Sequence, residues 1–528
     1  MQRRDVLKTA LAGTAALVAP RIARAQGAKD AKTILFTPQS DLASLDPVWT
    51  TADITRNFSL AVYDTLYAYD AQFNVQPQMV AGATTESDGK LWKLTLRDGL
   101  TFHDGTPVLA SDCVTSITRF CVRNAFGQAL AMRIDGITAP SDKVIQFRLK
   151  QPFALLPNAL AEVYCVMMPQ RLAKTDAFTQ ISEAVGSGPF KYLASERIVG
   201  QRVVFEKFDK YVPRPGGVPS FNAGPKIVYV DRVVWNVIPD PATALAALTQ
   251  GETDWWEQPT IDLIPLLQRS KGITVAVKDR TGEMGCLRFN QLFPPFDNAA
   301  IRRVVVAAMD QKEVMDAVAG SDLSLVRTDI GLFVPGTPMA STVGVKITRG
   351  PKNYARLKQD LIAAGYKGEK VVILAASNFP AIWAEAQVAT DTLKKIGMNV
   401  DFQALDWSAV VQRRASKQPI DKGGWNIFFT YLGGFGNISP APNIVITSGN
   451  GAWFGWPNDP AMDKLRAGWF DAPNLAAQKK IAEQMQVEFW KNPSYAPLGM
   501  YDQPTAFHDY LTGIPAGWPQ FYGVKKNA

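Results

Sequence analysis

The sequence predicts an α/β fold. From about residue 290 the pattern alternates between helices and strands, and before it short strands recur between turns. In the second part, helical apolar spacing is found at 298–309, 353–364 and 379–395. Short apolar runs, typical of strands, lie at 371–374, 400–405 and 425–432. In the first part we expect strands at 34–38, 144–149, 202–205 and 233–238.

Residues 1–25 have the pattern of an export signal. A basic start with Arg3-Arg4 precedes a short apolar run, and an A-R-A cleavage site follows at 23–25. The apolar run is too short for a bilayer helix, which needs about 20 residues. The paired arginines, with Leu7-Lys8 after them, resemble a twin-arginine (Tat) signal. We therefore expect a periplasmic protein that is exported by the Tat route.

Charge and hydropathy exclude two classes of partner. The formal net charge is +8, and half of that excess lies within the first 25 residues. No dense Lys/Arg block follows, so nucleic acid is not an expected partner. No other apolar run is long enough to span a membrane. We expect a monomer.

The four cysteines are expected to be free thiols. Cys113 and Cys121 lie eight residues apart on one predicted helix, about 12 Å along its axis. That separation exceeds the reach of a disulfide. A Tat substrate also folds in a reducing cytosol, where its fold cannot depend on bridges.

The most informative segment is residues 94–107, L-T-L-R-D-G-L-T-F-H-D-G-T-P. Asp-Gly pairs at 98–99 and 104–105 supply the positive φ angles of tight turns, so we expect two short strands, each followed by a turn. A helix should follow, with Ser111-Asp112 as its caps.

This double turn closely resembles the signature of the peptide/nickel-type (family 5) extracellular solute-binding proteins of ABC importers. Further motifs of that family follow the same order along almost the entire chain after the signal. They are L-D-P at 45–47, Y-D-x-L at 63–66, G-x-G-P-F at 186–190, an N…P-F…A-M-D segment at 290–310 and L-x-x-A-G-Y at 361–366.

The resemblance implies a two-lobed periplasmic binding protein type II fold with an extra subdomain in the first lobe. The first lobe would span 26–283 with the subdomain at about 65–185, and the second lobe 284–495. A return segment, 496–528, would pack on the first lobe, and the two crossing segments would form a hinge. The implied function is to capture a peptide or other small organic solute in the interlobe cleft and to deliver it to ABC permease subunits in the inner membrane.

Sequence motifs of catalysis are missing. The two histidines, His103 and His508, cannot form a three-histidine zinc site, and there is no H-E-x-x-H, G-x-S-x-G or P-loop. We predict no enzyme activity, no cofactor and no metal site. Two alternatives stay open: a secreted ligand-sensing receptor subunit, and a hydrolase that uses a pair of carboxylates.

The family places much of its ligand contact in a loop after a second-lobe strand, here residues 425–440. Dipeptide-binding relatives carry an Asp there for the peptide ammonium, and the nearest match in this chain is Gly434. They also use an Arg before the long second-lobe helix, where this chain has A-A-S-N-F-P at 375–380. Both charge anchors of a zwitterionic dipeptide are therefore missing from the expected positions.

The remaining candidates are aromatic or polar. Aromatic walls suit apolar or ring-bearing solutes, with a few polar groups to orient them. Trp407 is expected to serve packing instead. The predicted ligand-binding residues are Tyr431, Phe435, Trp453, Trp456, Gly434, Asn437, Asn378 and Thr51.

Overall fold

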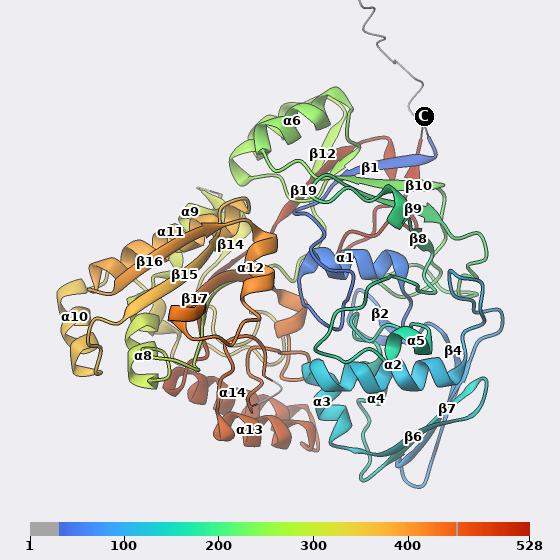
Figure 1. The fold of residues 1–528 in the computed structure, drawn as a ribbon, viewed down its shortest axis with the longest axis horizontal. Helices are drawn as coiled ribbons and strands as arrows, with labels where there is room; N and C mark the ends of the chain where they lie inside the picture. Colours follow the sequence, from blue (N-terminus) through green and yellow to red (C-terminus); the bar gives the residue numbers. More distant parts are fainter. Residues whose placement is uncertain (1–30, 321, 450–451, 528) are drawn as a thin grey trace, which may run out of the picture.

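The computed structural model of the 528-residue chain describes residues 31–320, 322–449 and 452–527. Two large sheets lie side by side, and helices pack on them (Figure 1). We call the part built on the seven-stranded sheet lobe one and the part built on the six-stranded sheet lobe two. The export signal expected at residues 1–25 lies outside the described residues.

Lobe one is centred on the sheet order β12-β19-β11-β1-β10-β9-β8. Its strands are β1 (Thr33–Thr37), β8 (Phe190–Tyr192), β9 (Arg202–Lys207), β10 (Arg232–Asn236), β11 (Trp255–Trp256), β12 (Ile273–Val277) and β19 (Pro504–His508). β1 pairs in parallel with β10 and β11, which sets Phe36 opposite Trp235 and Trp255. Phe36 packs edge to face with Trp255 at 5.1 Å and in a tilted arrangement with Trp235 at 5.7 Å, and these rings belong to the lobe-one core. The helices α1 (Asp53–Val62), α6 (Pro241–Gln250) and α7 (Ile264–Arg269) accompany this sheet.

The double-turn segment begins in a separate four-stranded sheet of order β4-β5-β7-β6, where its first residues end β5. Its strands are β4 (Val80–Glu86), β5 (Leu91–Leu96), β6 (Ile134–Ser141) and β7 (Val144–Leu149), and it is accompanied by α2 (Ala110–Arg123), α3 (Ala125–Ala131), α4 (Leu156–Leu160) and α5 (Gln170–Ala173). The second strand expected in the double turn is reduced to one bridge, between Thr101 and Pro107. The expected caps are displaced, since Leu109 is the N-cap and Asp112 lies inside the first turn. The Asp112 carboxylate accepts the Leu109 N–H at 2.9 Å, so it caps the helix from within.

Lobe two has the sheet order β14-β18-β13-β17-β15-β16. Its strands are β13 (Glu283–Phe289), β14 (Val326–Arg327), β15 (Lys370–Ala376), β16 (Asn399–Leu405), β17 (Ile427–Gly433) and β18 (Tyr495–Tyr501). Its helices are α8 (Ala299–Ala308), α9 (Gln311–Ala319), α10 (Tyr354–Ala363), α11 (Pro380–Lys395), α12 (Trp407–Arg413), α13 (Pro460–Phe470) and α14 (Leu475–Lys491). The helix–strand alternation predicted from residue 290 onward is therefore present, with boundaries within about two residues. Gly365 and Gly397 follow α10 and α11 with φ of 102° and 93°, as helix-ending glycines require.

The chain crosses between the lobes twice. β12 belongs to the lobe-one sheet and β13 to the lobe-two sheet, so the first crossing is 278–282. β18 pairs with β13 through Tyr501, and β19 is already in the lobe-one sheet, so the second crossing is 502–503. The expected return segment began at 496, six residues earlier, because the family pattern gives no signal for where the pairing of β18 ends.

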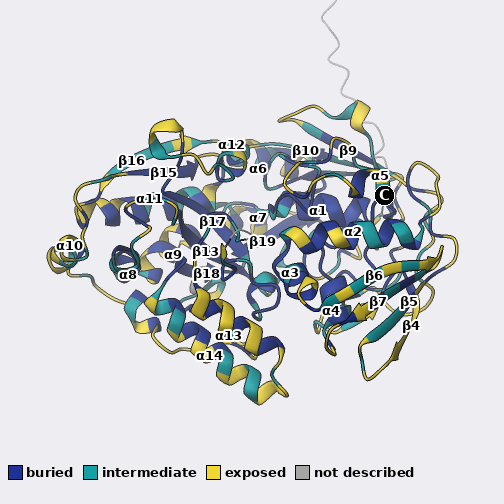
Figure 2. Cartoon of the chain, turned by 60° about the horizontal axis from the view of Figure 1, so that its bottom comes forward, coloured by how far each residue is buried: buried dark blue, intermediate teal, exposed yellow. Residues whose placement is uncertain are grey.

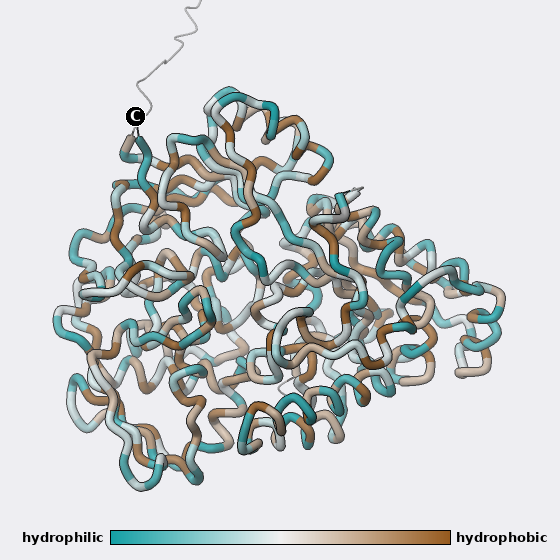
Figure 3. The backbone as a smooth tube through the Cα atoms, turned by 180° about the vertical axis from the view of Figure 1, so that it is seen from behind, coloured by the Kyte–Doolittle hydropathy of each residue, from teal (hydrophilic) through white to brown (hydrophobic). Residues whose placement is uncertain are grey.

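The buried residues lie mainly in the central strands of the sheets. In Figure 2 the central strands are dark blue, whereas α13 and α14 show exposed outer faces. Hydrophobic and hydrophilic residues interleave along the chain, without a long continuous brown stretch (Figure 3). Within the described ranges, none of the helices combines the length and apolar character needed to cross a bilayer. All four cysteines are buried free thiols, as predicted.

Candidate ligand-binding cleft

A cavity lies between the two lobes and has two connected compartments. The inner compartment has a volume of about 80 Å³ and the outer one about 220 Å³. The inner walls include, from lobe one, Gln39, Thr51, Asp53, Arg56, Asn124, Glu162, Tyr164 and Trp518, and, from lobe two, Trp407, Arg414, Tyr431, Phe435, Asn437, Ile444 and Trp453. The outer walls include Trp49, Arg123, Phe178, Lys417, Phe454 and Trp456. Thr51, Asn124, Tyr164, Ile444 and Trp453 line both compartments and join them.

Direct contacts hold the lobes together across this cavity. The Trp453 indole N–H donates to the Thr51 hydroxyl at 3.2 Å. The Tyr431 hydroxyl donates to the Gln39 side chain and accepts from Gln258 at 3.3 Å. α12 also lies beside the segment that leads into α1 (Figure 1). With these contacts, the two lobes are in a closed arrangement.

Phe435 makes the most extensive aromatic contact between the lobes. Its ring lies 5.0 Å from Tyr69, 5.5 Å from Phe73, 5.6 Å from Phe221 and 5.2 Å from Trp518, all in lobe one. Only 4% of Phe435 is exposed, so most of its surface is used in this contact. Phe435 thus lines the inner compartment and also joins the two lobes.

The structure brings most of the predicted site residues to the cavity. Thr51, Tyr431, Phe435, Asn437 and Trp453 line the inner compartment. Trp456 lines the outer compartment, with the Lys417 ammonium 5.2 Å from its ring.

Gly434 and Asn378 do not line either compartment. A Cβ at Gly434 would lie 2.1 Å from the Thr281 carbonyl oxygen, so the backbone of the first crossing fills the space of a side chain. The Asn378 side chain instead accepts the Trp407 N–H at 2.8 Å and so fixes the start of α12. Trp407, expected to serve packing, both packs against Phe379 at 5.8 Å and lines the inner compartment.

Four charged side chains in the inner wall were not predicted: Asp53, Arg56, Glu162 and Arg414. Asp53 and Arg56 are one turn apart on α1 and form an ion pair of 2.9 Å. The Arg56 guanidinium also lies 4.6 Å from the Trp518 ring. The spacing of three residues, about one turn of a helix, was a signal for the first pair. No sequence pattern indicates that Glu162 and Arg414 are buried.

Burial shifts the pKa values of two charged groups in the inner wall, Glu162 and Arg414. It raises the pKa of the Glu162 carboxyl to about 8, because no charged partner offsets its desolvation. It also lowers the pKa of the Arg414 guanidinium to about 9, against the opposing charge of nearby groups. At neutral pH Glu162 is therefore mostly a neutral acid, and Arg414 is a cation.

Several inner-wall residues carry a buried polar atom that lacks a hydrogen-bond partner within the described part of the chain. These atoms are Asp53 Oδ2, Arg56 Nε, Glu162 Oε1, Arg414 Nε, Asn437 Oδ1 and Trp518 Nε1. Buried polar groups in proteins are nearly always paired, so these atoms mark the inner wall as a costly polar environment.

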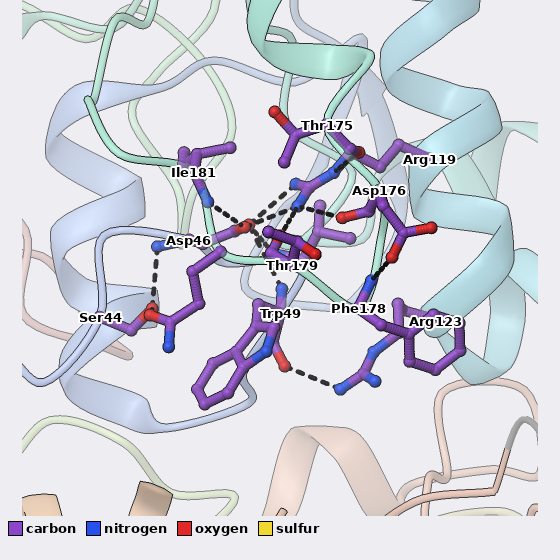
Figure 4. A network of polar contacts seen from close by, with 12 residues as sticks. Ser44, Asp46, Trp49, Arg119, Arg123, Thr175, Asp176, Phe178, Thr179 and Ile181 are labelled. Carbon is purple, nitrogen blue, oxygen red and sulfur yellow. Dashed lines mark hydrogen bonds and ion pairs between the residues drawn. The ribbon is translucent and has the colours of Figure 1, made fainter.

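A buried ion pair positions the loop that carries Thr50 and Thr51 (Figure 4). The Asp46 carboxylate accepts two hydrogen bonds from Arg119, of 2.9 and 2.7 Å. It also accepts the N–H groups of Val48 at 3.0 Å and Ile181 at 3.0 Å. The loop is thus fixed to α2 before it reaches the cavity.

The histidines are structural and lie outside the cavity. His103 Nε2 lies 3.0 Å from the Gly188 carbonyl, and burial lowers the pKa of this histidine to about 4. His508 Nε2 lies 2.8 Å from the Leu248 carbonyl. Across the described residues, no three His, Cys, Asp or Glu side chains gather in a way that could hold a metal ion.

A protein-family model matches most of this sequence. Residues 74–455 match the bacterial extracellular solute-binding proteins, family 5. The chain belongs to this family. It is 37% identical, over its entire length and 99% of the relative, to the probable peptide ABC transporter periplasmic-binding protein y4tO of Sinorhizobium fredii. It is also 23% identical, over 95% of its length and 94% of the relative, to the glutathione-binding protein GsiB of Pectobacterium atrosepticum.

Solved structures confirm the fold. The periplasmic binding protein AgaA of A. tumefaciens, in complex with agropinic acid, superposes with a TM-score of 0.78 at 21% identity, covering 94% of this chain and 99% of that one. DppA from Helicobacter pylori, in complex with a peptide, gives a TM-score of 0.77 at 18% identity, covering 94% and 98%. This chain is therefore a periplasmic solute-binding component of an ABC transporter and not an enzyme, as predicted.

Proposed function

We propose that this protein captures a peptide or another small organic solute in the interlobe cleft and delivers it to ABC permease subunits in the inner membrane. The observation that carries the proposal is a cavity between the lobes whose walls combine aromatic and polar side chains from both of them. The two crossings at 278–282 and 502–503 act as the hinge, and ligand shifts the population toward the closed form. The protein acts as a monomer after Tat export.

The ligand contacts follow from the cavity walls. Tyr431 and Trp453 provide aromatic surfaces, and both bond across the lobes, so they sense closure as well as ligand. Asn437 and Thr51 orient the ligand through their polar groups. Trp456 contacts the part of the ligand that extends into the outer compartment.

Two of the predicted residues act indirectly. Gly434 lets the ligand loop pass directly against the first crossing, and its N–H donates to the Gly282 carbonyl at 2.7 Å. Asn378 orients Trp407, which forms part of the wall. The space that a dipeptide-binding Asp would occupy is filled by backbone, which favours ligands other than free dipeptides.

The relatives support two ligand classes. y4tO is named as a probable peptide-binding protein and AgaA is described with agropinic acid, so peptides and other organic solutes both suit the family. The inner compartment admits only a group of a few heavy atoms, since one water needs about 10–15 Å³ of such volume. The ligand therefore places one compact group inside and extends the rest outward.

The test is capture of solutes from the native source. Mature protein purified from its own periplasm, or exposed to periplasmic extract, is examined by native mass spectrometry, and the bound mass is released and identified. Trp453→Ala should reduce occupancy at least tenfold, because it removes a cavity wall and an interlobe hydrogen bond. Trp490→Ala is the matched control, since Trp490 packs on Phe489 at 5.0 Å and lines neither compartment. Equal occupancy in wild type and Trp453→Ala would contradict the proposal.

A further inference from the structure

Arg414 has an unusual environment for a buried arginine. It caps the end of α12 and is only 2% exposed. Its guanidinium carbon lies 4.8 Å from the Phe454 ring, 5.5 Å from Trp407 and 5.8 Å from Trp453. Among the described residues, its guanidinium makes one long hydrogen bond, 3.4 Å from Nη2 to the Thr50 hydroxyl of lobe one.

Several other buried arginines of this chain make more and shorter hydrogen bonds than Arg414 does. Arg119 holds Asp46 and two backbone carbonyls at 2.7–2.9 Å. Arg466 donates to three carbonyls at 2.8–3.0 Å, and Arg288 to three at 2.7–3.2 Å. These arginines join segments of the fold, whereas Arg414 joins its lobe to the other by one weak bond.

No carboxylate of the described residues lies within 4 Å of the Arg414 guanidinium, and its Nε–H has no partner there. Aromatic faces attract a cation, but they do not accept the in-plane N–H groups of a guanidinium. A buried charge without an ion-pair partner is costly, and a carboxylate that arrives beside it would offset part of that cost. Arg414 lines the inner compartment, so a bound molecule there can lie against its side chain.

We propose that Arg414 holds a carboxylate group of the transported solute, so that the ligand class is carboxylate-bearing organic solutes. This inference rests on the proposed function. A guanidinium presents two parallel N–H donors that match a carboxylate. A single guanidinium and a compartment of about 80 Å³ suit one carboxylate better than a phosphate dianion, which requires more donors and charge. The Thr50 hydroxyl beside Arg414 adds a contact from lobe one, so the carboxylate completes the closed form.

The remaining inner-wall groups are consistent with this placement. The Asp53–Arg56 pair is internally neutralised, and the Glu162 carboxyl can donate to a neutral oxygen of the same ligand. Of the two arginines in the inner wall, Arg56 has an ion pair and Arg414 has none among the described residues, although the charge of Asp53 also acts on Arg414. The body of the solute extends along Trp453 toward Trp456 and Phe178 in the outer compartment.

The test compares one solute mixture before and after its carboxylates are removed. Periplasmic extract is used untreated, and again after carbodiimide coupling with methylamine, which converts carboxylates to neutral amides. Wild-type protein should take up mass from the untreated extract and at least tenfold less from the amidated one. Arg414→Met should lose at least tenfold of its occupancy from the untreated extract, and Arg414→Lys should retain an intermediate share. Released ligands separate the sources, because peptides yield amino acids on hydrolysis and other organic acids do not.

Stability gives a second readout that a structural arginine would not produce. Ligand-free Arg414→Met should unfold at the same or a higher temperature than wild type, because a buried unpaired cation is removed. Arg466→Met, the matched control, should unfold at a lower temperature, because it leaves three carbonyls without their donor. Equal uptake from the amidated extract, or full occupancy in Arg414→Met, would overturn the carboxylate assignment and leave the proposed function standing. No uptake by wild type from either extract would overturn the proposed function and this inference with it.

Discussion

Phe435→Ala should weaken ligand capture without unfolding either lobe. Phe435 belongs to lobe two, but its ring contacts four aromatic side chains of lobe one at 5.0–5.6 Å. Truncation of a buried Phe costs about 3–5 kcal/mol in a protein core. Because these contacts exist only when the lobes are closed, most of that cost falls on closure. A loss of about 3 kcal/mol lowers the apparent affinity about 100-fold, at about 1.4 kcal/mol for each factor of ten.

The assay titrates periplasmic extract and follows bound mass by native mass spectrometry, with small-angle X-ray scattering of the same samples. Phe435→Ala should need about 100-fold more extract for half occupancy, and its radius of gyration should be that of an open form. Phe296→Ala is the control, since Phe296 is buried and packs 4.9 Å from Phe289 within lobe two. It should lower the unfolding temperature and leave occupancy unchanged. Wild-type occupancy and compactness in Phe435→Ala would refute the closure argument.

Three further predictions concern Gly434 in the ligand loop, the ion pair of Asp46 with Arg119, and the buried carboxyl of Glu162. Gly434→Asp should lower the unfolding temperature and create no dipeptide binding, because its Cβ would clash with backbone, whereas Gly436→Asp, with open space around its Cβ, should be tolerated in a thermal-shift assay. Asp46→Asn should lower the free energy of unfolding by about 3–5 kcal/mol in urea titrations, because it leaves the buried Arg119 without its counter-charge. Glu162→Gln should flatten the fall in stability between pH 5 and 8. The folded-state pKa of Glu162 is raised to about 8, so the folded form binds its proton where the unfolded form has lost it, and wild type loses stability as pH rises through that window.

Each of these three has an outcome that contradicts its reasoning. Dipeptide binding by Gly434→Asp would mean that the first crossing moves aside to admit the side chain. An unchanged urea midpoint in Asp46→Asn would mean that the carbonyl contacts of Arg119 suffice. Parallel pH profiles of wild type and Glu162→Gln would mean that Glu162 is ionised in the folded protein.

Local pattern determined much of the fold. The helical spacing of 380–395 and the apolar run of 427–433 are properties of short segments, so their elements were predictable to within about two residues. The ordered family motifs also indicated the solute-binding class. The turn residues predicted the double turn but not its details, because the capping of α2 depends on a carboxylate that folds back on the chain.

The aromatic part of the site was predictable for a related reason. Tyr431 lies in β17, and Phe435 and Asn437 follow that strand directly, so one correctly placed strand carries all three to the cavity. Asn378 and Gly434 were predicted in the same way, but the Asn378 side chain bonds to Trp407, and backbone fills the space beside Gly434. The sequence does not tell which residues line the cavity and which ones support its walls.

The sequence by itself determined the α/β class, the solute-binding family and the aromatic character of the ligand loop, because each is encoded by contiguous residues. Only the tertiary structure decided which charges enter the cleft. Glu162 and Arg414 are 252 positions apart, come from different lobes and look like surface residues in the sequence. Both are buried in the folded protein, and Arg414 has no ion-pair partner within 4 Å among the described residues. Desolvation depends on how distant segments pack and not on any one segment, which is why the charged anchor of the site could not be read from the chain.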